Sequence, residues 1–170
     1  MRKGVLEFID LATKMPDIQF VWAGNFAFKG ISEGRKEIME HMDDLPDNVH
    51  FLGLVERDRM NEFFNMGDVM LQLSFEELFP MTILESMNAN IPLLLRDLPE
   101  YKPILLDYYL KANSQQTFKD ELTKLKEDAD YYAKACEGSK RGEQFYSKES
   151  ILEQWQQFYD KVATERNLLS

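Results

Sequence analysis

Two glutamates eight positions apart, Glu77 and Glu85, are the residues of this chain whose type and spacing could do chemistry. Between them Pro80 suits the first turn of a helix, which predicts Glu77 in a loop and Glu85 in the second helical turn. Carboxylates accept hydrogen bonds from sugar hydroxyls, and open amides at a helix start bind phosphate oxygens. The spacing therefore indicates a site for a phosphorylated, hydroxyl-rich ligand, whose remaining contacts come from the helix start: Phe79, Pro80, Met81 and Thr82.

A plainer interpretation of the same pattern is a helix whose acidic residues complement its dipole, without any ligand. On spacing alone this alternative is at least as good as a binding site. Glu76 is a rival to Glu77, because the two carboxylates are adjacent in the loop.

Short apolar runs alternate with helical periodicity around this segment, which predicts a parallel sheet with helices on both faces. Ligands of such doubly wound α/β domains bind at the carboxyl ends of the strands. We expect one Rossmann-like domain over residues 1–145 and a C-terminal helix within 146–170 that packs on the domain or reaches toward another one. The expected strands are residues 18–22, 49–52, 68–73 and 92–95, and the expected helices are residues 5–12, 33–42 and 81–88, followed by a helical tail.

Composition excludes several classes of function. A formal net charge of −10 over 170 residues gives no overall attraction to nucleic acid or to an anionic membrane. The single cysteine, Cys136, excludes an internal disulfide, and no Cys/His cluster has the spacing of metal ligands. No apolar run reaches the roughly 20 residues of a membrane span. We expect a metal-free cytoplasmic protein whose membrane contact, if any, is peripheral.

Four blocks, in order along the chain, resemble the C-terminal domain of retaining GT-B glycosyltransferases, the family of glycogen synthase and sucrose synthase (glycosyl transferases group 1). Glu77 and Glu85 match the family's Glu-x7-Glu pattern, and the sequence continues to Pro92 in a similar way. The other blocks are Lys3-Gly4, Val21-Trp22-Ala23-Gly24, and Asn48-Val49-His50-Phe51-Leu52-Gly53 with Asp68-Val69.

This resemblance implies roles for individual residues. Glu77 would lie beside the donor sugar, Glu85 would bind the ribose hydroxyls, and Lys3 would pair with the diphosphate. Asn25, after the glycine turn, is a further candidate for nucleotide contact, although asparagine in a turn more often satisfies local backbone groups. The family uses such side chains and helix-start amides in place of a divalent ion, so the resemblance implies neither a metal nor a cofactor.

The loop Arg96-Asp97-Leu98-Pro99-Glu100-Tyr101, together with Glu76-Glu77, resembles Gram-positive enzymes that glucosylate diacylglycerol from UDP-glucose. The implied function is transfer of a hexosyl group, with glucose from UDP-glucose as the expected donor, to an acceptor hydroxyl. The sequence leaves the acceptor open, and a membrane lipid is one candidate. Two alternatives remain open: a sugar-nucleotide-binding module without transfer activity, and a GT-B sugar-nucleotide epimerase.

The family pattern also contains a strand and a Gly-Arg turn ahead of the Lys-Gly turn, which this sequence lacks. We expect a fragment or a truncated product that is silent without an N-terminal domain. Because the lacking strand is central in the family's sheet, we also expect an open position that a neighbouring chain could fill, which would allow homo-oligomers.

Overall fold

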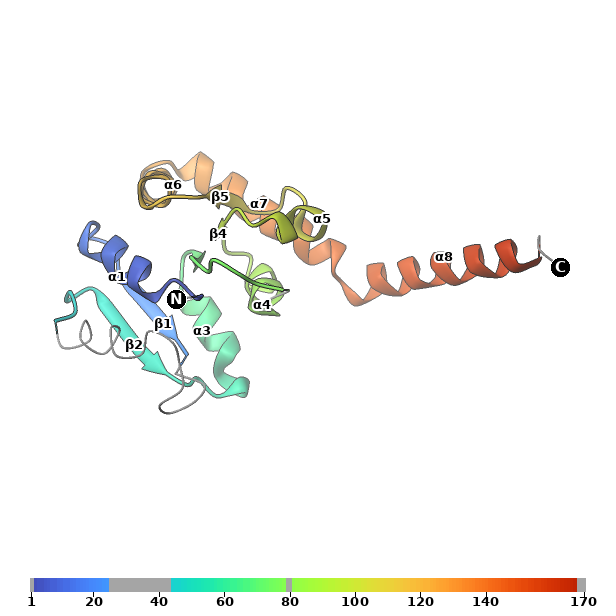
Figure 1. Ribbon diagram of the computed structural model, residues 1–170, viewed down its shortest axis with the longest axis horizontal. Helices are drawn as coiled ribbons and strands as arrows, with labels where there is room; N and C mark the ends of the chain where they lie inside the picture. The colour runs from blue at the N-terminus through green and yellow to red at the C-terminus, as the bar shows by residue number, and fades with distance from the viewer. Residues whose placement is uncertain (1, 25–43, 79–80, 168–170) are drawn as a thin grey trace.

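The computed structural model describes residues 2–24, 44–78 and 81–167, so the helix predicted over residues 33–42 lies outside the described residues. Within these ranges helices and strands alternate along the chain (Figure 1). The strands are β1 (Phe20–Ala23), β2 (Val49–Gly53), β3 (Met70–Gln72), β4 (Leu93–Arg96) and β5 (Leu110–Ala112). The helices are α1 (Val5–Thr13), α3 (Met60–Met66), α4 (Met81–Asn88), α5 (Lys102–Leu105), α6 (Gln115–Glu127), α7 (Ala129–Phe145) and α8 (Lys148–Asn167), with short 3-10 helices at Arg57–Arg59 and Pro99–Tyr101.

All strand pairs among the described residues are parallel, which confirms the predicted α/β class. The pairing is divided into two sheets. One holds β1 and β2, and the other holds the strands in the order β3-β4-β5. No described residue pairs β1 with β3.

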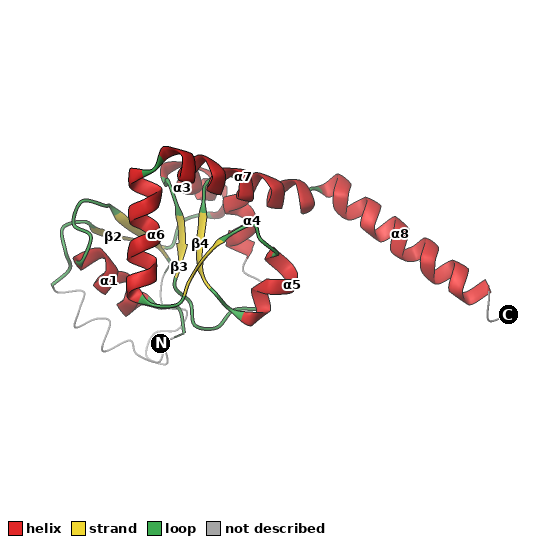
Figure 2. Ribbon diagram, turned by 90° about the horizontal axis from the view of Figure 1, so that it is seen from above, coloured by secondary structure: helices red, strands yellow, loops and turns green. Residues whose placement is uncertain are grey.

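Helices cover both faces of the larger sheet (Figure 2). Successive side chains of β4 accordingly enter two different cores. Leu94 joins a core with α1 and α6, whereas Leu93 and Leu95 join a second core with α4 and the segment around Tyr101. All three leucines are at most 1% exposed. Burying each one stabilises the fold by roughly 1.5–3 kcal/mol. This two-sided burial is typical of a parallel strand in a doubly wound sheet.

Asn48 sets where the first sheet begins. Its buried amide nitrogen lies 3.1 Å from the carbonyl of Ala12, 3.0 Å from that of Met15 and 2.8 Å from that of Ile18. These contacts satisfy the carbonyls at the end of α1 and hold the chain up to Ile18 outside the ladder. The observed strand therefore starts at Phe20, two residues later than the pattern of residues 18–22 predicted.

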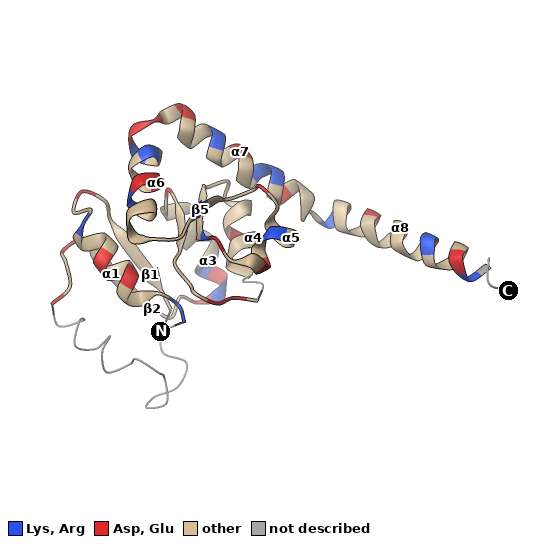
Figure 3. Cartoon of the chain, turned by 45° about the horizontal axis from the view of Figure 1, so that its top comes forward, with Lys and Arg blue, Asp and Glu red and all other residues tan. Residues whose placement is uncertain are grey.

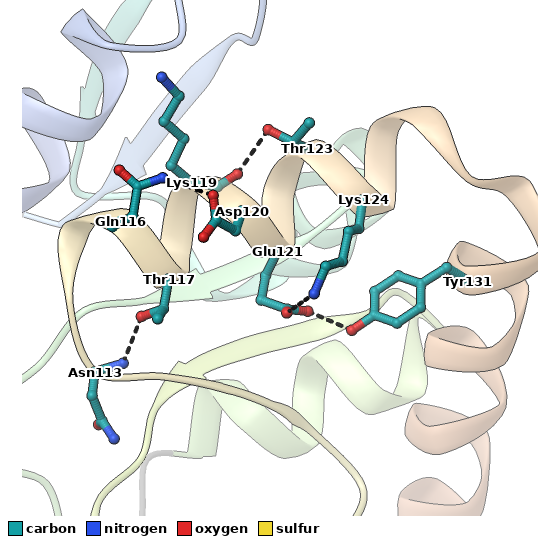
Figure 4. A network of polar contacts seen from close by, with 9 residues as sticks. All are labelled: Asn113, Gln116, Thr117, Lys119, Asp120, Glu121, Thr123, Lys124 and Tyr131. Atoms are coloured by element: carbon teal, nitrogen blue, oxygen red, sulfur yellow. Dashed lines mark hydrogen bonds and ion pairs between the residues drawn. The ribbon is translucent and has the colours of Figure 1, made fainter.

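Side-chain hydrogen bonds hold α6 and α7 in place (Figure 4). Thr117 accepts from the backbone amide of Asn113, and Ser114 completes a capping box at the start of α6. Glu121 accepts from Lys124 at 2.7 Å and from the hydroxyl of Tyr131 on α7. The two helices are thereby joined at their polar surfaces as well as through the core.

The last helix, α8, projects away from the rest of the chain (Figure 1). The hydroxyl of Ser147 accepts from the amide of Ser150 at 3.2 Å and so caps the start of this helix. The apolar stripe of Leu152, Trp155 and Tyr159 is 53–63% exposed. Whether this segment packs on the domain or reaches toward another one stays a prediction. The 1–145 boundary itself stays a prediction, with α7 ending at Phe145.

Candidate active site at the end of strand β3

Lys3 and Glu77 form an ion pair just beyond the carboxyl end of β3. Lys3 Nζ lies 2.6 Å from Glu77 Oε1. The Lys3 side chain is 49% exposed, whereas that of Glu77 is only 7% exposed. The lysine can therefore reach an incoming ligand without unfolding, while the carboxylate is held in the protein.

Gln72, the last residue of β3, fixes the same carboxylate from below. Its amide nitrogen donates to Glu77 Oε1 at 2.9 Å and lies 3.4 Å from the hydroxyl of Tyr101. The side-chain amide oxygen of Gln72, Oε1, is buried and has no hydrogen-bond partner among the described residues. A buried acceptor without a donor costs about 1–3 kcal/mol. Placing Gln72 against Glu77 therefore lowers the free energy of unfolding.

The pKa of Glu77 results from two opposed effects. Burial of the carboxylate raises the pKa, but hydrogen bonds from Lys3, Ser74 and Gln72 and the charge of Lys3 together outweigh it. The net pKa lies below the ordinary value of a glutamate. Glu77 is accordingly a carboxylate at neutral pH, and it accepts hydrogen bonds but cannot donate one.

Gly4 allows Lys3 to approach this point. Its φ of 73° is left-handed, and a Cβ atom there would lie 2.6 Å from the carbonyl oxygen of Leu73. The amide of Phe75 donates to the carbonyl of Arg2 at 2.8 Å on the other side of the turn. The glycine of the Lys-Gly motif is thus required both by backbone conformation and by close contact with the end of β3.

Arg96, at the carboxyl end of β4, supports the loop that carries Glu77. Its guanidinium donates to the carbonyl of Leu73 at 3.0 Å and lies 3.8 Å from the ring centroid of Phe75. Burial lowers its pKa, and the charge of Glu7 acts in the opposite direction. In the sequence Arg96 stands out only as the first residue of the loop Arg96-Asp97-Leu98-Pro99-Glu100-Tyr101. It also connects β4, α6 and the Glu77 loop, since the ring of Phe118 lies 5.7 Å away.

The remaining predicted residues are distributed around the start of α4. The helix spans Met81–Asn88 as predicted, with Met81 and Thr82 in its first turn and Glu85 at the beginning of the second. Glu85 is partly exposed and makes no hydrogen bond or ion pair with a described residue. Phe79, Pro80 and Asn25 lie outside the described residues.

The two adjacent acids of the loop, Glu76 and Glu77, differ in burial and in partners. Glu76 is exposed, whereas Glu77 is buried and paired with Lys3. Sequence reasoning missed Gln72 altogether. Its signal was available as the only polar residue in the apolar run Val69-Met70-Leu71-Gln72-Leu73.

Basic and acidic residues both occur along α6, α7 and α8 (Figure 3). In the part of the chain that the structure describes, no group of three or more His, Cys, Asp or Glu residues could hold a metal ion. None of the described helices is both long enough and apolar enough to cross a membrane.

Comparison with known proteins shows that the chain is similar to glycosyltransferases. The family model described as "Glycosyl transferases group 1" matches residues 1–142. Alpha-galactosylglucosyldiacylglycerol synthase of Streptococcus pneumoniae is 37% identical over 162 residues, which are 95% of this chain and 43% of that protein. Processive diacylglycerol alpha-glucosyltransferase of Acholeplasma laidlawii is 29% identical over 126 residues, 73% of this chain and 37% of that protein. The chain thus spans less than half the length of these relatives.

Solved structures agree on the fold. Anabaena HepE in complex with UDP-glucose superposes with a TM-score of 0.76 at 18% identity, covering 96% of this chain and 46% of that one. Sucrose-phosphate synthase from Thermosynechococcus elongatus gives a TM-score of 0.73 at 17% identity, covering 96% and 43%. These likenesses assign the GT-B fold.

Proposed function

This chain belongs to the glycosyl transferases group 1 family, and on that premise we propose that it binds the donor of a retaining glycosyltransferase. The donor is a nucleotide-sugar, UDP-glucose, and the reaction transfers its hexosyl group to an acceptor hydroxyl. The observation that carries the proposal is the Lys3–Glu77 pair at the carboxyl end of β3, beside the start of α4. This is the edge at which parallel α/β sheets bind ligands.

The proposed roles follow from charge and exposure. Lys3, which is half-exposed, turns toward the diphosphate and neutralises the negative charge that grows on it as the sugar leaves. The first-turn amides of α4, at Met81 and Thr82, add the positive end of the helix dipole. These groups supply positive charge from the chain itself, so the proposal requires no divalent ion. Donor binding is then expected to be equal in EDTA and in magnesium.

We assign the binding of the donor's hydroxyl groups to Glu77 and Glu85. Glu77 is held as an unprotonated acceptor, which suits a hydroxyl of the donor hexose. Glu85 stands one turn further along α4 with its carboxylate unengaged by described residues, and we assign it to the two ribose hydroxyls. The helix thus carries a phosphate-binding end and a ribose-binding side.

For the acceptor we propose the hydroxyl of a diacylglycerol-based membrane lipid. The support is the 37% identity to alpha-galactosylglucosyldiacylglycerol synthase of Streptococcus pneumoniae. A peripheral location at the cytoplasmic face of a membrane belongs to the same proposal.

Calorimetric titration of the chain with UDP-glucose, ADP-glucose and GDP-mannose tests the donor. Saturable binding of UDP-glucose, with weaker or no binding of the other two, is expected. Equal affinity for all three would overturn the nucleotide assignment, and absence of binding by a chain that circular dichroism shows to be folded would overturn the donor site. Incubation of the chain with radiolabelled UDP-glucose and diacylglycerol vesicles tests the expectation that it transfers nothing without an N-terminal domain, and transfer by this chain would overturn that expectation.

A further inference from the structure

Arg96 ends β4, the middle strand of the larger sheet. Backbone pairing of this sheet stops at Gln72 in β3 and at Ala112 in β5. Leu73 and Asn113 are the first residues beyond these two flanking strands. The Arg96 side chain donates to the carbonyls of both, with Nε 3.0 Å from that of Leu73 and Nη1 3.4 Å from that of Asn113. The guanidinium therefore continues the hydrogen bonding of the sheet one residue past the strand ends.

The carbonyl of Leu73 lies between the two segments that carry Lys3 and Glu77. On one side Gly4, the neighbour of Lys3, packs so closely that a Cβ atom there would lie 2.6 Å from the Leu73 oxygen. On the other side Leu73 begins the loop that reaches Glu77 four residues later. A hydrogen bond from Arg96 to this one carbonyl therefore acts on the positions of the lysine and of the carboxylate together.

Phe75 gives Arg96 a second contact with the same loop. The ring of Phe75 is half-exposed, and the guanidinium lies 3.8 Å from its centroid. The buried ring of Phe118, on α6, lies 5.7 Å from the same guanidinium. A guanidinium within about 6 Å of an aromatic ring is attracted to it electrostatically. Arg96 therefore links a ring of the surface loop to a ring that is fixed in the core.

Arg96 makes these contacts without forming an ion pair. Its side-chain partners among the described residues are the two carbonyls and the two rings. Burial lowers the pKa of Arg96 by more than the charge of Glu7 raises it. A charge that is partly removed from water without an opposite charge beside it costs stability, and an apolar side chain at this position would avoid that cost. What only the guanidinium supplies is the directed bonds to the strand ends.

We propose that Arg96 is a positioning residue of the donor site, which holds Lys3 and Glu77 against each other. It acts through the carbonyl of Leu73 and the ring of Phe75, and it does not touch the donor. The effect on donor affinity rests on the proposed function, whereas the contacts themselves belong to the free chain. Loss of the guanidinium therefore loosens the contact between Lys3 and Glu77, and a loosened pair binds the donor less tightly.

The test compares Arg96→Met and Arg96→Lys with the wild-type chain in calorimetric titrations with UDP-glucose. Arg96→Met should weaken binding at least about tenfold. Arg96→Lys keeps the charge but lacks the planar fork of donors, so it should weaken binding less. Arg141→Met is the matched control, because Arg141 also donates to a neighbour, Asp107 at 3.2 Å, and lies 5.4 Å from the ring of Tyr108. It should leave the affinity unchanged.

The pKa of Glu77, measured by carboxyl-carbon NMR without donor, is the readout that a merely structural role would not move. A hydrogen bond and the charge of Lys3 lower this pKa, so a loosened pair should raise it. We expect a rise in Arg96→Met, a smaller rise in Arg96→Lys and none in Arg141→Met. A rise in Arg96→Met alone would overturn the proposal, because Arg96→Lys keeps the charge and the effect would then be electrostatic. Weaker donor binding with an unchanged pKa would also overturn it.

Phe75→Leu tests the same contacts without changing the arginine, and it decides the question if circular dichroism shows that Arg96→Met does not fold. It removes the ring beside the guanidinium from a half-exposed position. It should raise the pKa of Glu77 and weaken UDP-glucose binding by about threefold. No change in either quantity would contradict the proposal. If the wild-type chain binds no UDP-glucose, the proposed function fails, and the Glu77 titrations still show whether Arg96 positions the pair.

Discussion

Glu77 is held between the half-exposed ammonium group of Lys3 and the side-chain amide of Gln72. Lys3 is half-exposed and contacts Glu77 Oε1 at 2.6 Å, and Gln72 lies in β3 and contacts the same oxygen at 2.9 Å. The other carboxylate oxygen makes neither of these two contacts. It is the atom we assign to the hydroxyl of a bound hexose.

Lys3→Met is expected to raise the pKa of Glu77. Burial raises this pKa, and after the substitution only the hydrogen bonds from Ser74 and Gln72 lower it. In the wild-type chain the lowered pKa stabilises the fold above the unfolded value of ~4.3, and this contribution is lost as the pH falls through the folded-state pKa. The variant should therefore begin to lose this contribution at higher pH. Carboxyl-carbon NMR titration measures the shift.

Lys14→Met is the matched control, since Lys14 pairs with Asp10 on the exposed side of α1. It should leave the Glu77 titration unchanged. An unshifted Glu77 in Lys3→Met would show that the ion pair is not formed in solution.

Gln72→Leu should separate binding from stability. The change removes a hydrogen bond to Glu77, which destabilises the fold, and a buried side-chain oxygen without a partner, which stabilises it. Because the two effects oppose each other, the free energy of unfolding should change by less than about 1 kcal/mol. Donor affinity should fall roughly tenfold, as expected for loss of about 1.4 kcal/mol from a positioned carboxylate. Urea unfolding and calorimetry measure the two quantities, and a large loss of stability with unchanged affinity would contradict the assigned positioning role.

At this scale the sequence predicted which acid to choose but not what holds it. The Glu-x7-Glu register favoured Glu77 over Glu76, and the structure buries Glu77. Lys3 was placed through the Lys-Gly resemblance, and the contact with Glu77 joins segments 74 residues apart. Gln72 and Arg96 act through tertiary contacts across strand ends, which no local pattern encodes.

Among the elements, the turn between Lys3 and α1 is the most constrained. Gly4→Ala meets both a left-handed φ and the carbonyl of Leu73 at 2.6 Å, and it should destabilise the fold by about 1–3 kcal/mol. Gly53→Ala carries a similar φ of 68° but meets nothing within 4 Å, so it isolates the conformational cost. Gly67→Ala, with φ −95°, should be nearly neutral. Thermal unfolding should rank Gly4 above Gly53 above Gly67, and any other order would refute the close-contact argument.

The projecting helix should contribute little to folding. Leu152, Trp155 and Tyr159 remain exposed, so deletion from Leu152 onward should change the free energy of unfolding by less than about 1 kcal/mol. Urea unfolding followed by circular dichroism at a wavelength dominated by the remaining helices measures this. A loss of several kcal/mol would mean that α8 packs against the chain in solution.

Helix α4 shows how well periodicity performs when local signals agree. Pro80 and the apolar spacing predicted Met81–Asn88, which is the observed span. The strands were less well bounded: the run of residues 68–73 forms pairs only over Met70–Gln72. Strand ends depend on partners, and β3 has a partner strand on one side only among the described residues. The sequence left both placements of α8 open, since an amphipathic stripe does not say which surface it packs against.

At the scale of the whole molecule, an apolar cavity lies between the two parallel sheets, and Lys3, Ser74 and Glu77 are among the residues that line it. The proposed donor residues therefore border the gap between the sheets rather than one sheet alone.

The central claim is that the β3–α4 segment binds a nucleotide-sugar through its spaced glutamates. Calorimetric titration with UDP-glucose tests it most directly, comparing the wild-type chain with Glu85→Gln and with the exposed neighbour variant Glu76→Gln. The account predicts one site per chain, an affinity lowered at least about tenfold by Glu85→Gln, and little change for Glu76→Gln. Equal affinities in all three folded proteins would contradict it.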